Sequence, residues 1–121
     1  MKITTFNPLI VTAHPEETIA LFESLGFERR HKKQNVNEVG SSDVRMSLGD
    51  FRVDVADVKS VPQDIPMIRV NVDNYEEAYD FLTSKGFKKA FDTKVSEDAT
   101  GKGTSLISPS GFIIALAQHK K

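Results

Sequence analysis

The chain has 121 residues, no cysteine, and 16 basic against 17 acidic side chains, which gives a net charge of −1. A chain of this length forms one domain, or two repeats with a shared core, and can fold without disulfides. The lack of cysteine excludes a disulfide framework, a thiolate metal site and a cysteine nucleophile. The balanced charge argues against a nucleic-acid partner, and the first residues resemble neither a signal peptide nor a membrane span. We therefore expect a cytoplasmic protein with no membrane partner.

The first half of the chain predicts a strand, a helix and three further strands. The apolar residues 9–11 indicate the opening strand. Pro15, followed by two glutamates, favours the start of a helix, whose apolar stripe is Ile19, Phe22 and Leu25. Three strands then form a meander, and a polar segment that could lie over a site separates the first two. The strands are expected at residues 27–33, 44–48 and 51–56, and the polar loop at 34–42.

The second half predicts the same order of elements after a linker at residues 58–65. Residues 67–72 alternate in polarity, as a strand with one buried face does. Asn74 and Glu77 have the spacing of a capping box, and the helix that follows buries Tyr75, Ala78 and Leu82. The later strands are expected at residues 87–95, 104–107 and 112–117, with a polar loop at 96–103 and a turn at 108–111.

The two halves also match each other in sequence. At an offset of sixty, a pair of glutamates, a serine, a glycine and a phenylalanine coincide around the two helices, so that Gly26 corresponds to Gly86. Both glycines stand where a left-handed residue usually ends a helix. We interpret the chain as one α+β domain of two tandem βαβββ modules, residues 1–60 and 61–121.

Paired βαβββ modules whose helices end in Leu-Gly-Phe (25–27) and Lys-Gly-Phe (85–87), with a late Pro-Ser-Gly hairpin (109–111), resemble the vicinal oxygen chelate superfamily. This superfamily includes glyoxalase I, extradiol dioxygenases, fosfomycin-resistance enzymes and bleomycin-binding proteins. The resemblance covers nearly the whole chain. It implies a cup-shaped mixed sheet, a small-molecule ligand in the cup between the two modules, and a homodimer.

The resemblance also points to four positions that hold a divalent metal in the enzymes of the superfamily. Those enzymes use a histidine near the first strand and a glutamate in the last strand of each module. The corresponding positions here are Asn7, Asp54, Met67 and Ala115. Only Asp54 is a good ligand, whereas catalytic sites for zinc and similar metals generally need about three. We therefore expect no cofactor and no metal site, as in the bleomycin-binding members.

Strand alternation indicates which residues could bind a ligand. Val70 and Val72 are expected to pack on the second helix, and Phe51, Val53 and Val55 on the first, so the intervening side chains point to the other face of the sheet. That face mixes apolar and polar groups, as small-molecule sites do. The candidate ligand-binding residues are Asn7, Leu9, Arg52, Asp54, Met67, Arg69, Asn71 and Ala115.

Arg69 and Asp54 stand out among these residues. An inward arginine could bind an anionic ligand while Asp54 holds it, or the two could form a salt bridge or lie on a solvated face. The three histidines provide weaker evidence for a functional site. His14 precedes a helix, His31 lies in a charged edge strand or a cationic rim, and His119 lies in the tail.

Three functions remain open. The first is a metal-free module that binds and sequesters a small molecule. The second is a lyase, isomerase or dioxygenase of the superfamily with a rearranged metal site, built from Asp54 with His14 or His31. The third is a structural protein whose cup another chain fills.

Overall fold

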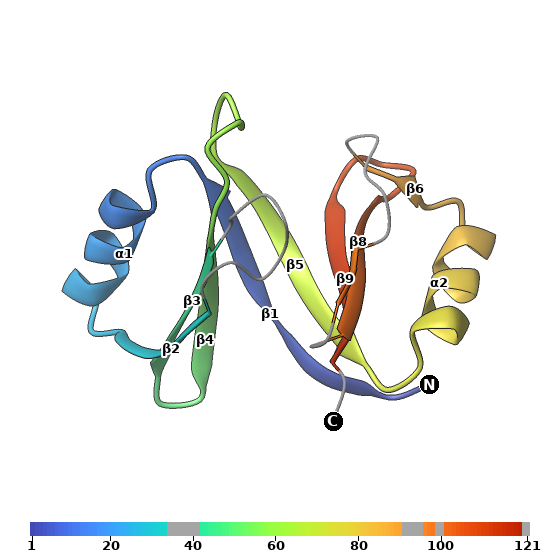
Figure 1. Ribbon diagram of the computed structural model, residues 1–121, viewed down its shortest axis with the longest axis horizontal. Helices are drawn as coiled ribbons and strands as arrows, with labels where there is room; N and C mark the ends of the chain where they lie inside the picture. Colours follow the sequence, from blue (N-terminus) through green and yellow to red (C-terminus); the bar gives the residue numbers. More distant parts are fainter. Residues whose placement is uncertain (34–41, 91–95, 99–100, 120–121) are drawn as a thin grey trace. The chain divides into compact units, whose positions relative to one another are not determined.

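The computed structural model describes residues 1–33, 42–90, 96–98 and 101–119 (Figure 1). The chain forms two compact units. We call Asn7–Pro66 the N-unit, and Met1–Phe6 together with Met67–Lys121 the C-unit. Both units contain a helix packed on one face of a β-sheet (Figure 1).

The sheet of the N-unit has the strand order β2-β3-β4-β1. Its elements are β1 (Ile3–Thr12), α1 (Pro15–Ser24), β2 (Glu28–Lys33), β3 (Ser42–Leu48) and β4 (Phe51–Asp57). The last strand runs parallel to β1 and antiparallel to β3, as a βαβββ connection requires. Helix α1 covers one face, where it buries Ile19 against Val44, Met46, Val53 and Val55.

Two apolar residues of the N-unit are more exposed than the sequence predicts. Leu25 and Phe51, both expected to pack with the helix, have 60% and 69% of their surface exposed. Leu25 is the C-cap of α1, so it already lies beyond the last helical turn. Phe51 is the first residue of β4, opposite Leu48, where the hairpin ends and α1 no longer covers the sheet.

The sheet of the C-unit has the order β5-β9-β8-β6, and β7 also pairs with β8. Its elements are β5 (Ile65–Val72), α2 (Tyr75–Ser84), β6 (Lys88–Lys89), β7 (Ser96–Asp98), β8 (Gly101–Ile107) and β9 (Ile113–His119). Strand β9 is parallel to β5 and antiparallel to β8. The core beneath α2 is Val70, Val72, Tyr75, Ala78, Leu106 and Leu116, so the face predicted for Val70 and Val72 is confirmed.

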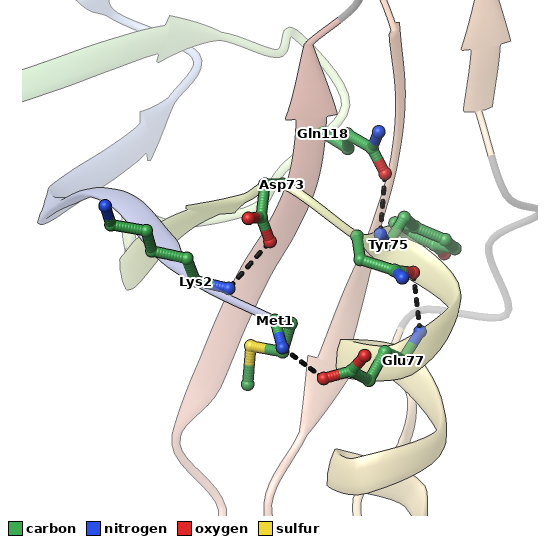
Figure 2. Close-up of polar contacts among 7 residues, drawn as sticks. Met1, Lys2, Asp73, Tyr75, Glu77 and Gln118 are labelled. Atoms are coloured by element: carbon green, nitrogen blue, oxygen red, sulfur yellow. Dashed lines mark hydrogen bonds and ion pairs between the residues drawn. The ribbon is translucent and has the colours of Figure 1, made fainter.

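Several polar contacts hold the start of α2. The Asn74 side chain accepts a hydrogen bond from the Glu77 amide at 3.1 Å, which confirms the predicted cap. The Gln118 side chain of β9 accepts a hydrogen bond from the Tyr75 amide, with 2.6 Å between the two atoms; Figure 2 draws this contact. The Asp73 carboxylate accepts from the Lys2 amide at 2.6 Å, and the amino group of Met1 pairs with Glu77 (Figure 2). The chain's first residues are therefore joined to the N-terminus of α2.

Other sequence expectations need correction in the C-unit. The segment 96–103 was expected to be a loop, but Ser96–Asp98 pairs with β8 in the register Glu97↔Lys102. Strand β6 has only two residues, whereas a strand was expected over 87–95, of which 91–95 lie outside the described residues. The predicted loop at 34–42 also lies outside them, except that β3 begins at Ser42. Within the described residues, neither helix is long enough to cross a membrane.

Candidate functional site

The face of the N-unit sheet opposite α1 carries a group of polar side chains. Val53 and Val55 point to the helix, so Arg52, Asp54 and Ala56 point to the other face. The register places Arg45 of β3 opposite Asp54 and Ser47 opposite Arg52. On the other side of β4, Leu9 of the parallel strand β1 lies beside Asp54. Three adjacent strands therefore bring these residues to one face.

Asp54 is the centre of this group. Its side chain is almost completely buried, with 2% of the residue exposed. The Asn7 amide nitrogen donates to Asp54 Oδ2 at 3.1 Å and also to the carbonyl of Pro8 at 2.9 Å. Arg45 Nε lies 3.8 Å from Asp54 Oδ1, which makes an ion pair. A protein cation and an amide donor thus compensate the cost of burying the carboxylate.

Arg52 lies next to this group and is half-buried. Its Nε and Nη2 atoms are shielded from solvent and have no hydrogen-bond acceptor among the described residues. The Asn7 Oδ1 atom is likewise buried without a donor in that part of the chain. A buried polar atom without a partner is costly, so these atoms mark a place where a ligand could supply the missing partners.

The corresponding face of the C-unit combines longer side chains with small neighbours. Met67 and Asn71 of β5 are buried, and Arg69 between them is half-buried. The adjacent strands place Ala115 and Ser105 in line with Arg69, and Ala117 and Gly103 in line with Asn71. Asn71 Oδ1 is another buried acceptor without a donor among the described residues. Small residues of β8 and β9 thus flank both polar side chains.

The eight predicted ligand-binding residues are divided between the two units. The N-unit holds Asn7, Leu9, Arg52 and Asp54, and the C-unit holds Met67, Arg69, Asn71 and Ala115. Ligand binding by any of them stays a prediction. Sequence reasoning missed Arg45, although its position between Val44 and Met46 is a signal that it faces away from the helix.

The residues at the four expected metal positions do not fit a metal centre. Asn7 and Asp54 contact each other, but the Asn7 nitrogen, which is not a metal-binding atom, faces the carboxylate. Met67 offers a poor thioether and Ala115 no donor at all. Within the described ranges, no three His, Cys, Asp or Glu side chains gather closely enough to hold an ion. The donor set is therefore unlike that of a catalytic metal site.

The histidines do not add ligands to Asp54 in the described part of the chain. His14 is exposed and precedes α1, the helix that packs on the opposite face of the sheet from Asp54. His31 lies in β2 and His119 ends β9, but the side chains of both lie outside the described residues.

Comparison with solved structures gives matches over nearly the full chain. A glyoxalase/bleomycin resistance protein/dioxygenase superfamily member from Vibrio splendidus has 16% sequence identity and a TM-score of 0.61, over 98% of this chain and 100% of that one. A methylmalonyl-CoA epimerase from Mycobacterium tuberculosis has 14% identity and a TM-score of 0.69, over 98% and 90%. The methylmalonyl-CoA epimerase from Streptomyces coelicolor in complex with 2-nitronate-propionyl-CoA has 14% identity and a TM-score of 0.63, over 99% and 100%. No protein-family model and no curated protein matches the sequence.

Proposed function

Because the chain has the fold of the vicinal oxygen chelate superfamily, we propose that it binds a small molecule without a metal ion and thereby sequesters it. The ligand binds on the sheet face opposite the helices. This fold serves both enzymes and binding proteins, so the function has to be argued from the residues on that face.

The observation that carries the proposal is the set of contacts made by the Asp54 carboxylate. Of the four positions that correspond to metal ligands, only this one has kept a carboxylate, and its oxygens are approached by Asn7 Nδ2 and Arg45 Nε. A metal ion that bound Asp54 would have to displace the Arg45 guanidinium group or lie next to its positive charge. Coulomb repulsion at such short range in a buried site opposes cation binding strongly. Arg45 thus takes the charge-compensating role that a metal ion would have.

The character of the face also supports binding of a small molecule. Leu9 and Ala56 are buried apolar residues beside the polar group around Asp54 in the N-unit, and Met67 is a buried apolar residue on the corresponding face of the C-unit. Pockets for small molecules generally combine mostly apolar walls with a few polar groups that fix the orientation of the ligand. The Streptomyces coelicolor epimerase, in complex with 2-nitronate-propionyl-CoA, is an example of this fold with a small-molecule ligand.

The test combines metal analysis with ligand binding. We expect purified protein without an affinity tag to contain less than stoichiometric metal by elemental analysis. Its thermal transition should stay unchanged with chelator and with Mg²⁺, Mn²⁺, Fe²⁺, Ni²⁺ or Zn²⁺, because a ligand that binds only the folded state raises the transition temperature. One equivalent of bound metal, together with a lower transition after chelation, would overturn the proposal and favour a metal-dependent lyase, isomerase or dioxygenase.

We further propose that the protein is a homodimer. Support comes from large apolar side chains that are exposed near the β3–β4 turn, namely Leu25, Leu48 and Phe51. Clustered apolar surface often marks an interface between subunits. Size-exclusion chromatography with light scattering should give about twice the mass of one chain, and a strictly monomeric protein would contradict this.

A further inference from the structure

We propose that Arg45 and Arg52 of the N-unit form an anion-binding site that receives a carboxylate or phosphate group of the ligand. The inference deepens the proposed function and rests on it, because it names the chemical class of the small molecule. It depends on two observations: the positions of the two arginines and the buried atoms that have no partner among the described residues.

The two arginines lie close enough to act on one group. Arg45 is opposite Asp54 and Arg52 is opposite Ser47 in the antiparallel pair β3–β4. Arg45 and Arg52 are therefore diagonal neighbours on the same face, a relationship that places Cα atoms about 7–8 Å apart and leaves long side chains within reach of each other. Both guanidinium groups can contact a single ligand oxygen pair from adjacent strands.

Among the described residues, the carboxylates on this face leave the buried Nε and Nη2 donors of Arg52 without an acceptor. Asp54 lies next to both arginines, and its two oxygens already face Asn7 and Arg45. Glu28 of β2 lies in line with Ser47 and Arg52, and Asp43 lies opposite Ala56, one side-chain row from Arg45. Because the charges on this face are close to balanced, recognition of an anion depends on these two donors.

The atoms without partners show where the ligand would bind. Arg52 Nε and Nη2 are buried and have no hydrogen-bond acceptor in the described part of the chain, whereas Arg45 Nε faces Asp54 Oδ1 at 3.8 Å. A guanidinium group presents its N–H donors as a planar fork, which matches the two oxygens of a carboxylate or phosphate. Water-shielded donors of this kind are expensive to leave unpaired, and they bind an anion more strongly than exposed lysines do.

Asn7 indicates that the ligand should also carry a hydrogen-bond donor. Its Nδ2 atom is committed to Asp54 and the Pro8 carbonyl, so its buried Oδ1 atom is an acceptor that needs a donor. Asn7 is two residues before Leu9, which pairs with Asp54, and its side chain contacts Asp54, so it lies on the same face of the sheet as Arg52. The site therefore fits an organic acid or phosphate ester with a hydroxyl or N–H group next to its charge.

The test is isothermal titration calorimetry with three probes of similar shape: benzoate, phenyl phosphate and the neutral benzamide. At low ionic strength we expect at least one anion to bind about tenfold or more tightly than benzamide, because hydrogen bonds to charged groups are strong. The preference should decrease in high salt. Comparison of benzoate with phenyl phosphate shows whether a carboxylate or a phosphate is recognised.

Variants connect the binding to the site. Arg52→Gln should remove the preference for the anion. The matched control Arg29→Gln, at an exposed arginine paired with Glu23, should leave the preference unchanged. Arg52→Lys keeps the positive charge but lacks the planar, forked arrangement of N–H donors of a guanidinium group. It should weaken anion binding several-fold, and it gives the same information if the glutamine variant does not fold.

The outcomes separate the two proposals. If benzamide binds as tightly as both anions, or if Arg52→Gln binds them like the wild type, the anion site is wrong and the metal-free binding protein stands. If no anion binds up to millimolar concentration, the anion site is also wrong. If binding of any probe requires an added divalent ion, the proposed function itself fails.

Discussion

Asn7 and Asp54 are joined by a buried hydrogen bond of 3.1 Å that connects β1 to β4, the first and last strands of the N-unit. Because both residues are buried, each has few alternative partners. Asn7→Ala should lower the free energy of unfolding by about 1–3 kcal/mol, since it removes a donor from a buried carboxylate. Urea denaturation followed by circular dichroism measures this change.

A double-mutant cycle tests whether the effect comes from this contact. Asn7→Ala, Asp54→Ala and the double variant should show a coupling free energy of about 0.5–3 kcal/mol, as residues in direct contact do. Arg29→Ala, which removes an exposed ion pair with Glu23, is the control and should change stability by less than about 1 kcal/mol. Additive effects in the cycle would contradict the contact.

The two helices give a second prediction, because their N-caps differ. Asn74 caps α2 with its side chain, whereas His14 makes no such hydrogen bond at the start of α1. Asn74→Ala should therefore cost about 1 kcal/mol, and His14→Ala much less. Thermal or urea unfolding of the two variants gives the comparison. An equal loss of stability in both variants would show that the Asn74 hydrogen bond adds no stability beyond that of an ordinary side chain.

The faces of the strands could be predicted from the sequence because side chains alternate with a strict period of two. The valines of 51–56 and 67–72 pack beneath the helices as expected. The contact between Asn7 and Asp54 follows from the same alternation once β1 pairs with β4. The prediction was wrong at Phe51 because alternation indicates a face and gives no information on how far the helix extends over it.

The missed features depend on how the strands pair. Arg45 belongs to the site because the β3–β4 register places it opposite Asp54, and the two-residue turn at 49–50 sets that register. Residues 96–98 are Ser, Glu and Asp, which have low strand propensity, so their strand exists through its pairing with β8. At the start of the chain, Met1–Phe6 belong to the C-unit, a relationship that no feature of these six residues indicates.

Gly86 and Gly111 provide a test of close packing in the C-unit. Both have positive φ angles, 98° and 110°, so alanine introduces similar backbone strain at each position. At Gly86 a Cβ atom would lie 2.9 Å from Pro109 Cγ, whereas at Gly111 no atom of the described residues would lie within 4 Å. Gly86→Ala should therefore destabilise the protein by about 1–3 kcal/mol more than Gly111→Ala, since the rigid proline ring has to move. Equal urea midpoints for the two variants would exclude the steric effect.

Tyr75 makes stability depend on alkaline pH. Burial, assisted by the neighbouring Tyr79 and Glu76, raises its pKa from the ordinary value of 10.0 to about 12. Its hydroxyl is buried without a hydrogen-bond partner among the described residues, and its ring stacks on Tyr79 with 5.9 Å between centroids. Between pH 10 and 12 the unfolded chain loses this phenolic proton while the folded protein keeps it, so the stabilisation present below pH 10 decreases as pH rises.

Ultraviolet titration near 295 nm can measure this ionisation, because the chain has two tyrosines and no tryptophan. Tyr75→Phe should abolish the transition near pH 12, and Tyr79→Phe should leave it. Since the hydroxyl has no partner in the described part of the chain, Tyr75→Phe should also keep or slightly raise stability at pH 7. In urea denaturation at pH 8 and pH 11, the wild type should lose more stability than Tyr75→Phe. An equal loss in both proteins would show that Tyr75 ionises normally in the folded state.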